Sequence, residues 1–176
     1  MRRRTRRAFP VLFAAFAALF LLPPVARAQA PAPGILGAAQ AGKLIPASVY
    51  FAGLTTTTQL RNSAGVRFAD GQLALAVLVD TSGYSDAVQQ KYQGYLLTGV
   101  ALDIGGHRLP PGAYGMGVVH GRLYVIDIGN HDLFHTAAMH DAKMHRPVPL
   151  QILAGAAPGS YRLCLGRDCV HFQRSQ

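Results

Sequence analysis

Glycine-containing turns divide most of this chain into short apolar segments, and this pattern restricts the fold more than any other feature. Asp70-Gly71 and His120-Gly121 each lie between two apolar segments, and Gly105-Gly106 closes a third. The predicted strands span residues 48–53, 66–69, 72–80, 94–104, 113–119, 122–128, 148–154, 161–165 and 169–172. Short strands at regular spacing predict an all-β fold, a single-domain antiparallel β-sandwich or barrel.

Helix signals are few. The eight acidic residues are all aspartates, and glutamate, the acidic residue that favours helices, is absent. Ser85 to Tyr92 is predicted to form a short helix, with Ser85 as its N-cap. Leu133 to Met139 is predicted to form a second one.

Residues 1–28 have the pattern of a secretory signal peptide. Five of the first seven residues are arginine, Val11 to Leu22 is apolar, and Ala26-Arg27-Ala28 predicts cleavage after Ala28. The apolar run is shorter than the roughly 20 residues of a membrane-spanning helix, so no membrane anchor is expected after signal removal. Thr5 to Phe9 resembles the twin-arginine export motif; the general secretory (Sec) route is favoured and twin-arginine (Tat) export is the alternative. The predicted location is periplasmic or secreted.

The remaining chain is divided into a flexible Ala/Pro/Gly lead-in at residues 29–42 and a β domain at residues 43–176. Residues 1–28 hold six of the 17 basic residues and none of the eight acidic ones. The rest of the chain therefore has 11 basic and eight acidic residues, a net charge of +3. These cations are scattered singly, so a nucleic-acid partner is not expected.

Cys164 and Cys169 are the only cysteines, and their C-x4-C spacing differs from the C-x-x-C of redox catalysts. A type II′ turn with Gly166-Arg167 at its centre would place the two cysteines directly opposite each other. The same register pairs Leu163 with Val170 on one face and puts Arg162 and His171 on the cysteine face. The register predicts a structural disulfide, which an oxidising compartment would favour. Free thiols and a redox or metal role are the alternatives.

Four histidines lie close together in the sequence, and two methionines are interleaved with them. The histidines are His131, His135, His140 and His145, and the methionines are Met139 and Met144. One helical turn would bring His131 and His135 to the same face, as a two-histidine metal site requires. Imidazole suits copper and zinc, and thioether selects Cu(I). The segment is therefore a candidate copper or zinc site, and a polar surface loop without metal is the alternative.

Other motifs point to packing. No catalytic motif is recognised: the chain has neither a G-x-S-x-G nucleophile elbow nor a phosphate-binding loop. Gly115 and Gly117 lie inside a predicted strand, where close packing explains them better than phosphate binding. Tyr84, Tyr92 and Tyr95 are interpreted as lining a sheet edge, and a ligand platform is the alternative.

The stretch from Ile104 to Tyr114 matches the pattern I-G-G-x-x-L-P-x-G-x-Y. It resembles a hairpin of small secreted bacterial all-β domains of unknown function, and the resemblance implies an exported β protein without implying an activity. The expected function is a non-enzymatic module, binding or structural, with an unknown ligand or protein partner. Exported copper or zinc binding through His131 to His145 is the alternative, and a hydrolase with an unrecognised site is disfavoured.

Overall fold

The computed structural model describes residues 32–175, so the predicted signal peptide and its cleavage site lie outside the described residues. Two short helices are present, α1 (Ala38–Ala41) and α2 (Asp86–Lys91). The first strands are β1 (Gly34–Leu36), β2 (Ser48–Phe51), β3 (Leu54–Arg67), β4 (Leu73–Val79), β5 (Gly94–Thr98), β6 (Leu102–Ile104) and β7 (His107–Leu109). The others are β8 (Gly112–Val119), β9 (Arg122–Ile126), β10 (Asp132–Ala137), β11 (Met139–His140), β12 (Leu150–Ala154), β13 (Ser160–Leu165) and β14 (Asp168–Arg174).

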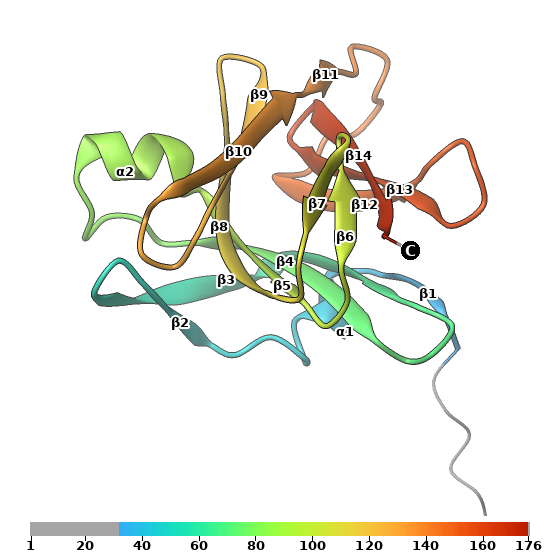
Figure 1. The fold of residues 1–176 in the computed structure, drawn as a ribbon, viewed down its shortest axis with the longest axis horizontal. Coiled ribbons are helices and arrows are strands. Elements are labelled where there is room, and N and C mark those ends of the chain that lie inside the picture. The colour runs from blue at the N-terminus through green and yellow to red at the C-terminus, as the bar shows by residue number, and fades with distance from the viewer. Residues whose placement is uncertain (1–31, 176) are drawn as a thin grey trace, which may run out of the picture.

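The strands form two antiparallel sheets that pack as a sandwich (Figure 1). The eight-stranded sheet has the order β1-β3-β4-β5-β8-β9-β10, with β2 also paired to β3. The six-stranded sheet has the order β12-β13-β14-β6-β7, with β11 also paired to β14. The all-β prediction is confirmed, and of its two forms the structure has the sandwich and not the closed barrel.

The main core lies between the two sheets, because alternate residues of each strand point to the same face. The eight-stranded sheet contributes small residues such as Ala74 and Ala76 together with Met116, which is completely buried. The six-stranded sheet contributes Leu163 and Val170, which are paired across β13 and β14. The inward face of the terminal hairpin is therefore the apolar face that its sequence predicted.

A second core covers the opposite face of the eight-stranded sheet. Phe51 of β2 is completely buried there, and its ring stacks on that of Tyr92 with centroids 3.7 Å apart. The hydroxyl of Tyr84 donates to the carbonyl of Phe51, and that of Tyr95 donates to the carbonyl of Tyr50. These two hydrogen bonds therefore connect β2 to the segment before α2 and to β5.

Two hairpin turns have the geometry that their sequences predicted. Gly105 and Gly106, at φ 57° and 86°, join β6 to β7, and His120 and Gly121, at φ 49° and 72°, join β8 to β9. Two successive positive φ values are the mark of the type I′ turn, which matches the twist of the flanking strands. The predicted helix after Ser85 is also confirmed as α2, with Ser85 at its N-cap.

Three predictions are wrong. The continuous strand at residues 94–104 is two strands in different sheets, because the chain turns at Val100, whose N–H and carbonyl both bond to the Thr98 hydroxyl. The helix at residues 133–139 is the strand β10, which pairs along β9. The lead-in predicted at residues 29–42 is not flexible in its described part, because Gly34–Leu36 form β1, which pairs with β3, and Ala41 of α1 is completely buried; residues 29–31 lie outside the described residues.

The Tyr92 hydroxyl provides a test of the second core. Its oxygen is buried and has no hydrogen-bond partner among the described residues, and burial raises the pKa of the Tyr92 side chain. Burying an unpaired hydroxyl is unfavourable, so Tyr92→Phe is expected to leave the free energy of unfolding unchanged or raise it by up to about 1 kcal/mol. Tyr95→Phe is expected to lower it by about 1 kcal/mol, because it removes the bond to the Tyr50 carbonyl. Urea denaturation of both variants measures the difference, and equal losses would contradict it.

Candidate functional site

The terminal hairpin of β13 and β14 forms the floor of the candidate site. Cys164 pairs with Cys169 in the predicted register, their Cα atoms are 4.0 Å apart, and a disulfide joins them. Gly166 has φ 59° while Arg167 is not in the positive-φ region, as a type II′ turn requires. The predicted disulfide and its turn are confirmed.

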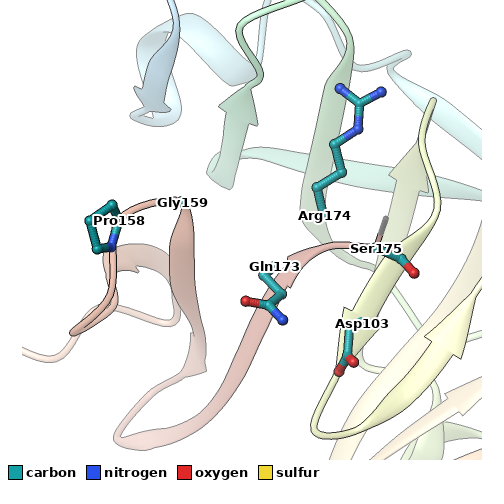
Figure 2. A pocket seen from close by; sticks show the side chains of 6 residues that line it. All are labelled: Asp103, Pro158, Gly159, Gln173, Arg174 and Ser175. Atoms are coloured by element: carbon teal, nitrogen blue, oxygen red, sulfur yellow. The ribbon is translucent and has the colours of Figure 1, made fainter.

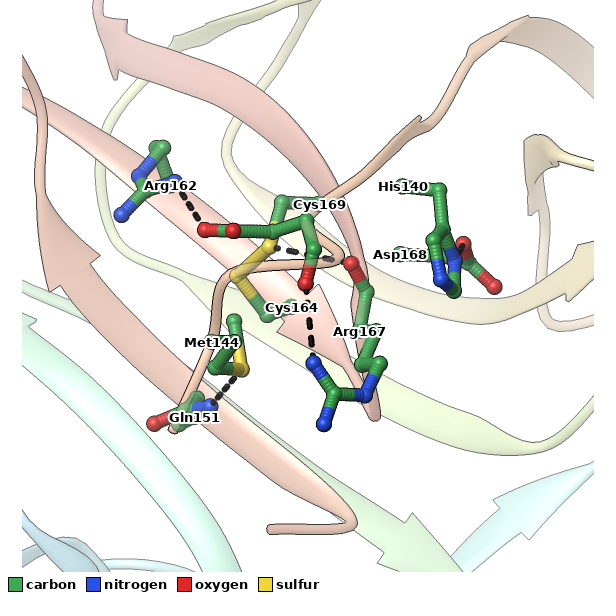
Figure 3. The surroundings of a disulfide bond; sticks show 9 residues. His140, Met144, Gln151, Arg162, Cys164, Arg167, Asp168 and Cys169 are labelled. Carbon is green, nitrogen blue, oxygen red and sulfur yellow. Dashed lines mark hydrogen bonds and ion pairs between the residues drawn. A yellow bond between two sulfur atoms is a disulfide. The ribbon is translucent and has the colours of Figure 1, made fainter. Parts of the chain in front are cut away.

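A segment at residues 139–149 covers the cysteine face of this hairpin. Met139 of β11 pairs with Cys169, and the Arg167 guanidinium donates to the carbonyls of Asp141 and Ala142. The Asp141 carboxylate in turn accepts a hydrogen bond from Arg162 Nη1 at 3.1 Å. Figure 3 shows Arg162 on one side of the disulfide, with His140 and Asp168 on the other. The disulfide is consequently buried although the hairpin is at the end of the chain.

Removing the disulfide is expected to lower the free energy of unfolding by about 2 kcal/mol, because the closed loop is short. The Cys164→Ala, Cys169→Ala double variant and the reduced wild-type protein should show similar losses in guanidinium denaturation. The double variant is the control for reductant effects, since its own midpoint should not move when reductant is added. A double variant as stable as the oxidised protein would contradict the prediction.

Three adjoining hollows run along the outer face of β14. The first, about 180 Å³, lies over Cys169; the second is about 240 Å³ and the third about 610 Å³. The first two share His171, and the last two share Asp103 and Gln173. We call this row of three hollows the β14 trough. It follows β14 from Cys169 to Ser175, which corresponds to about 20 Å of strand.

The wide end of the trough lies between β6, β14 and the turn before β13. Figure 2 shows Asp103 and Gln173 projecting to the same side from neighbouring strands, opposite Pro158 and Gly159. The Asp103 carboxylate accepts a hydrogen bond from the backbone N–H of Gly106, which fixes its position. Arg174 is directed elsewhere and bonds to Asp70 at 2.6 Å, and this bond lowers the pKa of the Asp70 carboxyl. This end therefore offers an acidic and an amide side chain.

The disulfide end of the trough is richer in imidazole groups. Arg162 and His171 are directly opposite each other in the register of β13 and β14. His140 lines the same hollow, and its Nδ1 is 2.8 Å from a carboxylate oxygen of Asp168. Each end of the trough is lined by one carboxylate and one guanidinium, and the two histidines distinguish the disulfide end from the wide end.

The four histidines of the predicted metal site are separated. His131 lies in the turn after β9, His135 is on the edge strand β10 against the Tyr124 ring, His140 is on β11, and His145 is exposed in the covering segment. Because residues 132–137 are a strand, four residues span about 13 Å and not one helical turn. Among residues 32–175 no group of three or more histidine, cysteine or acidic side chains could hold a metal ion. The predicted copper or zinc site therefore lacks its geometric basis.

His131 instead belongs to a local turn. The Asp127 carboxylate accepts hydrogen bonds from the backbone N–H of His131 and of Gly129, and the His131 ring lies 2.9 Å from it. These bonds, led by that from the His131 backbone, lower the pKa of the Asp127 carboxyl. This aspartate shapes the connection between β9 and β10.

Part of the trough was predictable from the sequence. The hairpin register already placed Arg162 and His171 on one face, but it did not indicate that this face is hollowed. Asp103 joins the site only because β6 pairs with β14, opposite Gln173. The sequence did not predict this pairing, because residues 94–104 were predicted as one strand, without the turn at Thr98 to Ala101 that carries the chain into the second sheet.

Comparison with protein-family models, with curated proteins and with solved structures finds no match for this chain. Within the described part of the chain, no helix is long and apolar enough to span a membrane.

Proposed function

We propose that this protein is an exported, non-enzymatic β-sandwich module that binds an extended polar ligand in the β14 trough. The observation that carries the proposal is the row of three hollows along β14, in which neighbouring hollows share His171 or share Asp103 and Gln173. A depression about 20 Å long accommodates a short chain of sugar or amino-acid units in extended form. Several of its lining side chains, among them Asp103, His171 and Gln173, are hydrogen-bonding groups that would fix the orientation of such a chain.

The rigidity of the floor also supports a binding role. The floor of the trough is built on β13, β14 and β6, which are paired to one another, and its walls come from β11 and from the turn at Pro158 and Gly159. The disulfide cross-links β13 and β14, and the ion pair between Arg162 and Asp141 holds the covering segment against them. A preformed site loses less entropy when it binds, so affinity does not have to compensate for ordering a loop.

Export is supported by the sequence of residues 1–28 and by the disulfide, which forms in oxidising compartments. Full-length protein expressed in a bacterium is expected to appear outside the cytoplasm with Gln29 as its first residue. N-terminal sequencing of the exported fraction tests this. Cytoplasmic protein that retains Met1 to Ala28 would contradict it.

Ligand binding is tested with a panel of short oligosaccharides and peptides, followed by backbone amide chemical shifts. A ligand is expected to shift signals along β14, and His171→Ala and Gln173→Ala are expected to weaken it about tenfold each, the loss of roughly one good hydrogen bond. His145→Ala is the matched control, because His145 is exposed outside the trough. Shifts confined to another face would contradict the proposal, and turnover of a panel member would replace it with an enzymatic function.

A further inference from the structure

The strand register brings two nitrogen-bearing side chains together at the disulfide end of the trough, where Asp141 of the covering segment is the carboxylate paired with Arg162. Arg162 lies between Leu153 of β12 and His171 of β14. His171 lies between Arg162 and Gly105, whose backbone N–H donates to the His171 carbonyl. The Asp141 carboxylate balances the Arg162 charge on one side of the guanidinium, and an anion bound on the His171 side would pair with the donors that remain on both groups.

Both side chains keep hydrogen-bonding capacity for such an anion. Arg162 has five N–H donors, and Asp141 accepts from Nη1 only. The His171 ring makes no hydrogen bond within residues 32–175 and lines the hollow over Cys169. The Arg162 side chain is only 31% exposed, which strengthens its interaction with an anion compared with a cation in open solvent.

The charged side chains around Arg162 and His171 leave the position between them open to an anion. Arg167 donates to the backbone carbonyls of Asp141 and Ala142 in the covering segment. These acceptors are neutral, so Arg167 adds a positive charge near the hollow. The Asp168 carboxylate is bonded to His140 Nδ1, and this bond holds the His140 ring at the wall of the hollow. Asp141 shows that a carboxylate already fits against the Arg162 guanidinium at 3.1 Å.

We propose that the disulfide end of the β14 trough is an oxyanion subsite, in which Arg162 and His171 hold a carboxylate, phosphate or sulfate group of the ligand. This inference rests on the proposed function and gives it a ligand class: an extended polar chain that carries an anionic group. The hollow of about 180 Å³ is large enough for one such group. Because His140 and His171 line this end, the anionic group would bind here and the rest of the chain would extend toward Gln173.

Titration of the purified protein with inorganic phosphate, sulfate and acetate, at constant ionic strength with chloride as the balancing salt, tests the subsite. Saturable shifts of the His171 and His140 ring signals and of the Arg162 side-chain signal are expected with at least one of the three anions. His171→Gln is expected to weaken binding about tenfold, as expected for one hydrogen bond to a charged group. It leaves the ion pair between Arg162 and Asp141 in place.

Arg162→Gln is expected to weaken binding further, with a thermal unfolding curve checking that the variant is folded. Arg122→Gln is the matched control, because Arg122 is an exposed arginine on β9 outside the trough. Shifts that do not saturate, or affinities that His171→Gln leaves unchanged, would overturn the inference. If neutral chains bind the trough while these anions do not, the subsite fails and the proposed function stands. If the anions bind while no extended chain does, the subsite stands alone.

Discussion

Phe51→Ala is expected to lower the free energy of unfolding by about 3–5 kcal/mol, the range for truncating a buried aromatic side chain. Phe51 is completely buried, stacks on Tyr92 and meets the Tyr84 ring edge-on with centroids 5.8 Å apart. Truncation would leave a cavity between β2 and the other strands of the eight-stranded sheet. Paired strands restrict how far the surrounding residues can collapse into such a cavity. Urea denaturation followed by circular dichroism measures the loss.

The neighbouring residue supplies the control for this prediction. Tyr50 lies on the opposite face of β2 and is 56% exposed, so Tyr50→Ala is expected to change stability by less than about 0.5 kcal/mol. The bond from Tyr95 goes to the Tyr50 backbone carbonyl and survives the substitution. Equal losses for the two variants would mean that β2 does not cover a second core.

Gly117→Ala is expected to cost about 3 kcal/mol, the upper part of the usual range for overpacking. A Cβ on Gly117 would lie 2.5 Å from the carbonyl oxygen of Lys91, at the end of α2. The obstacle is backbone, so no side-chain rotation relieves it. The residues after α2 would have to move away, which would break the hydrogen bond from the Gln93 N–H to the Met116 carbonyl.

Gly83→Ala is the matched control, since a Cβ on Gly83 meets nothing within 4 Å. Its effect on the denaturation midpoint is expected to be small. A Gly117→Ala variant as stable as Gly83→Ala would contradict the close contact between α2 and β8. A different contact accounts for the other glycine of β8, because a Cβ on Gly115 would lie 2.7 Å from both the Phe51 ring and the Ile126 side chain. Close packing, which the sequence favoured over phosphate binding, is therefore the reason for both glycines.

Much of the local structure was predictable because it depends on residues adjacent in the chain. A type I′ turn needs two residues that tolerate positive φ, and His120-Gly121 provides them. The disulfide followed from a two-residue turn and the alternation of the hairpin, so it needed no knowledge of the rest of the fold. The strand β10 was predicted as a helix because its pairing with β9 is a tertiary contact that no pattern within residues 133–139 specifies.

The candidate site was less predictable. Arg162 and His171 could be placed on one face, but the covering segment that makes this face a hollow depends on contacts between Arg167 and the residues after β11. The histidines between 131 and 145 were a candidate metal site because they are close along the chain. In the fold they lie on a turn, an edge strand, a two-residue strand and a loop, and only His140 lines the trough.

The sequence by itself determined the fold class, the hairpins, the disulfide and the polar face of the terminal hairpin, since each depends on turn chemistry or on alternation along a strand. Only the tertiary structure decided which strands share a sheet and where the trough lies. The turn at Thr98 to Ala101 moves the chain from one sheet to the other and brings Asp103 beside Gln173, 70 residues later in the chain. Such pairings are selected by burial of a shared core, a property of the whole chain that no local pattern specifies.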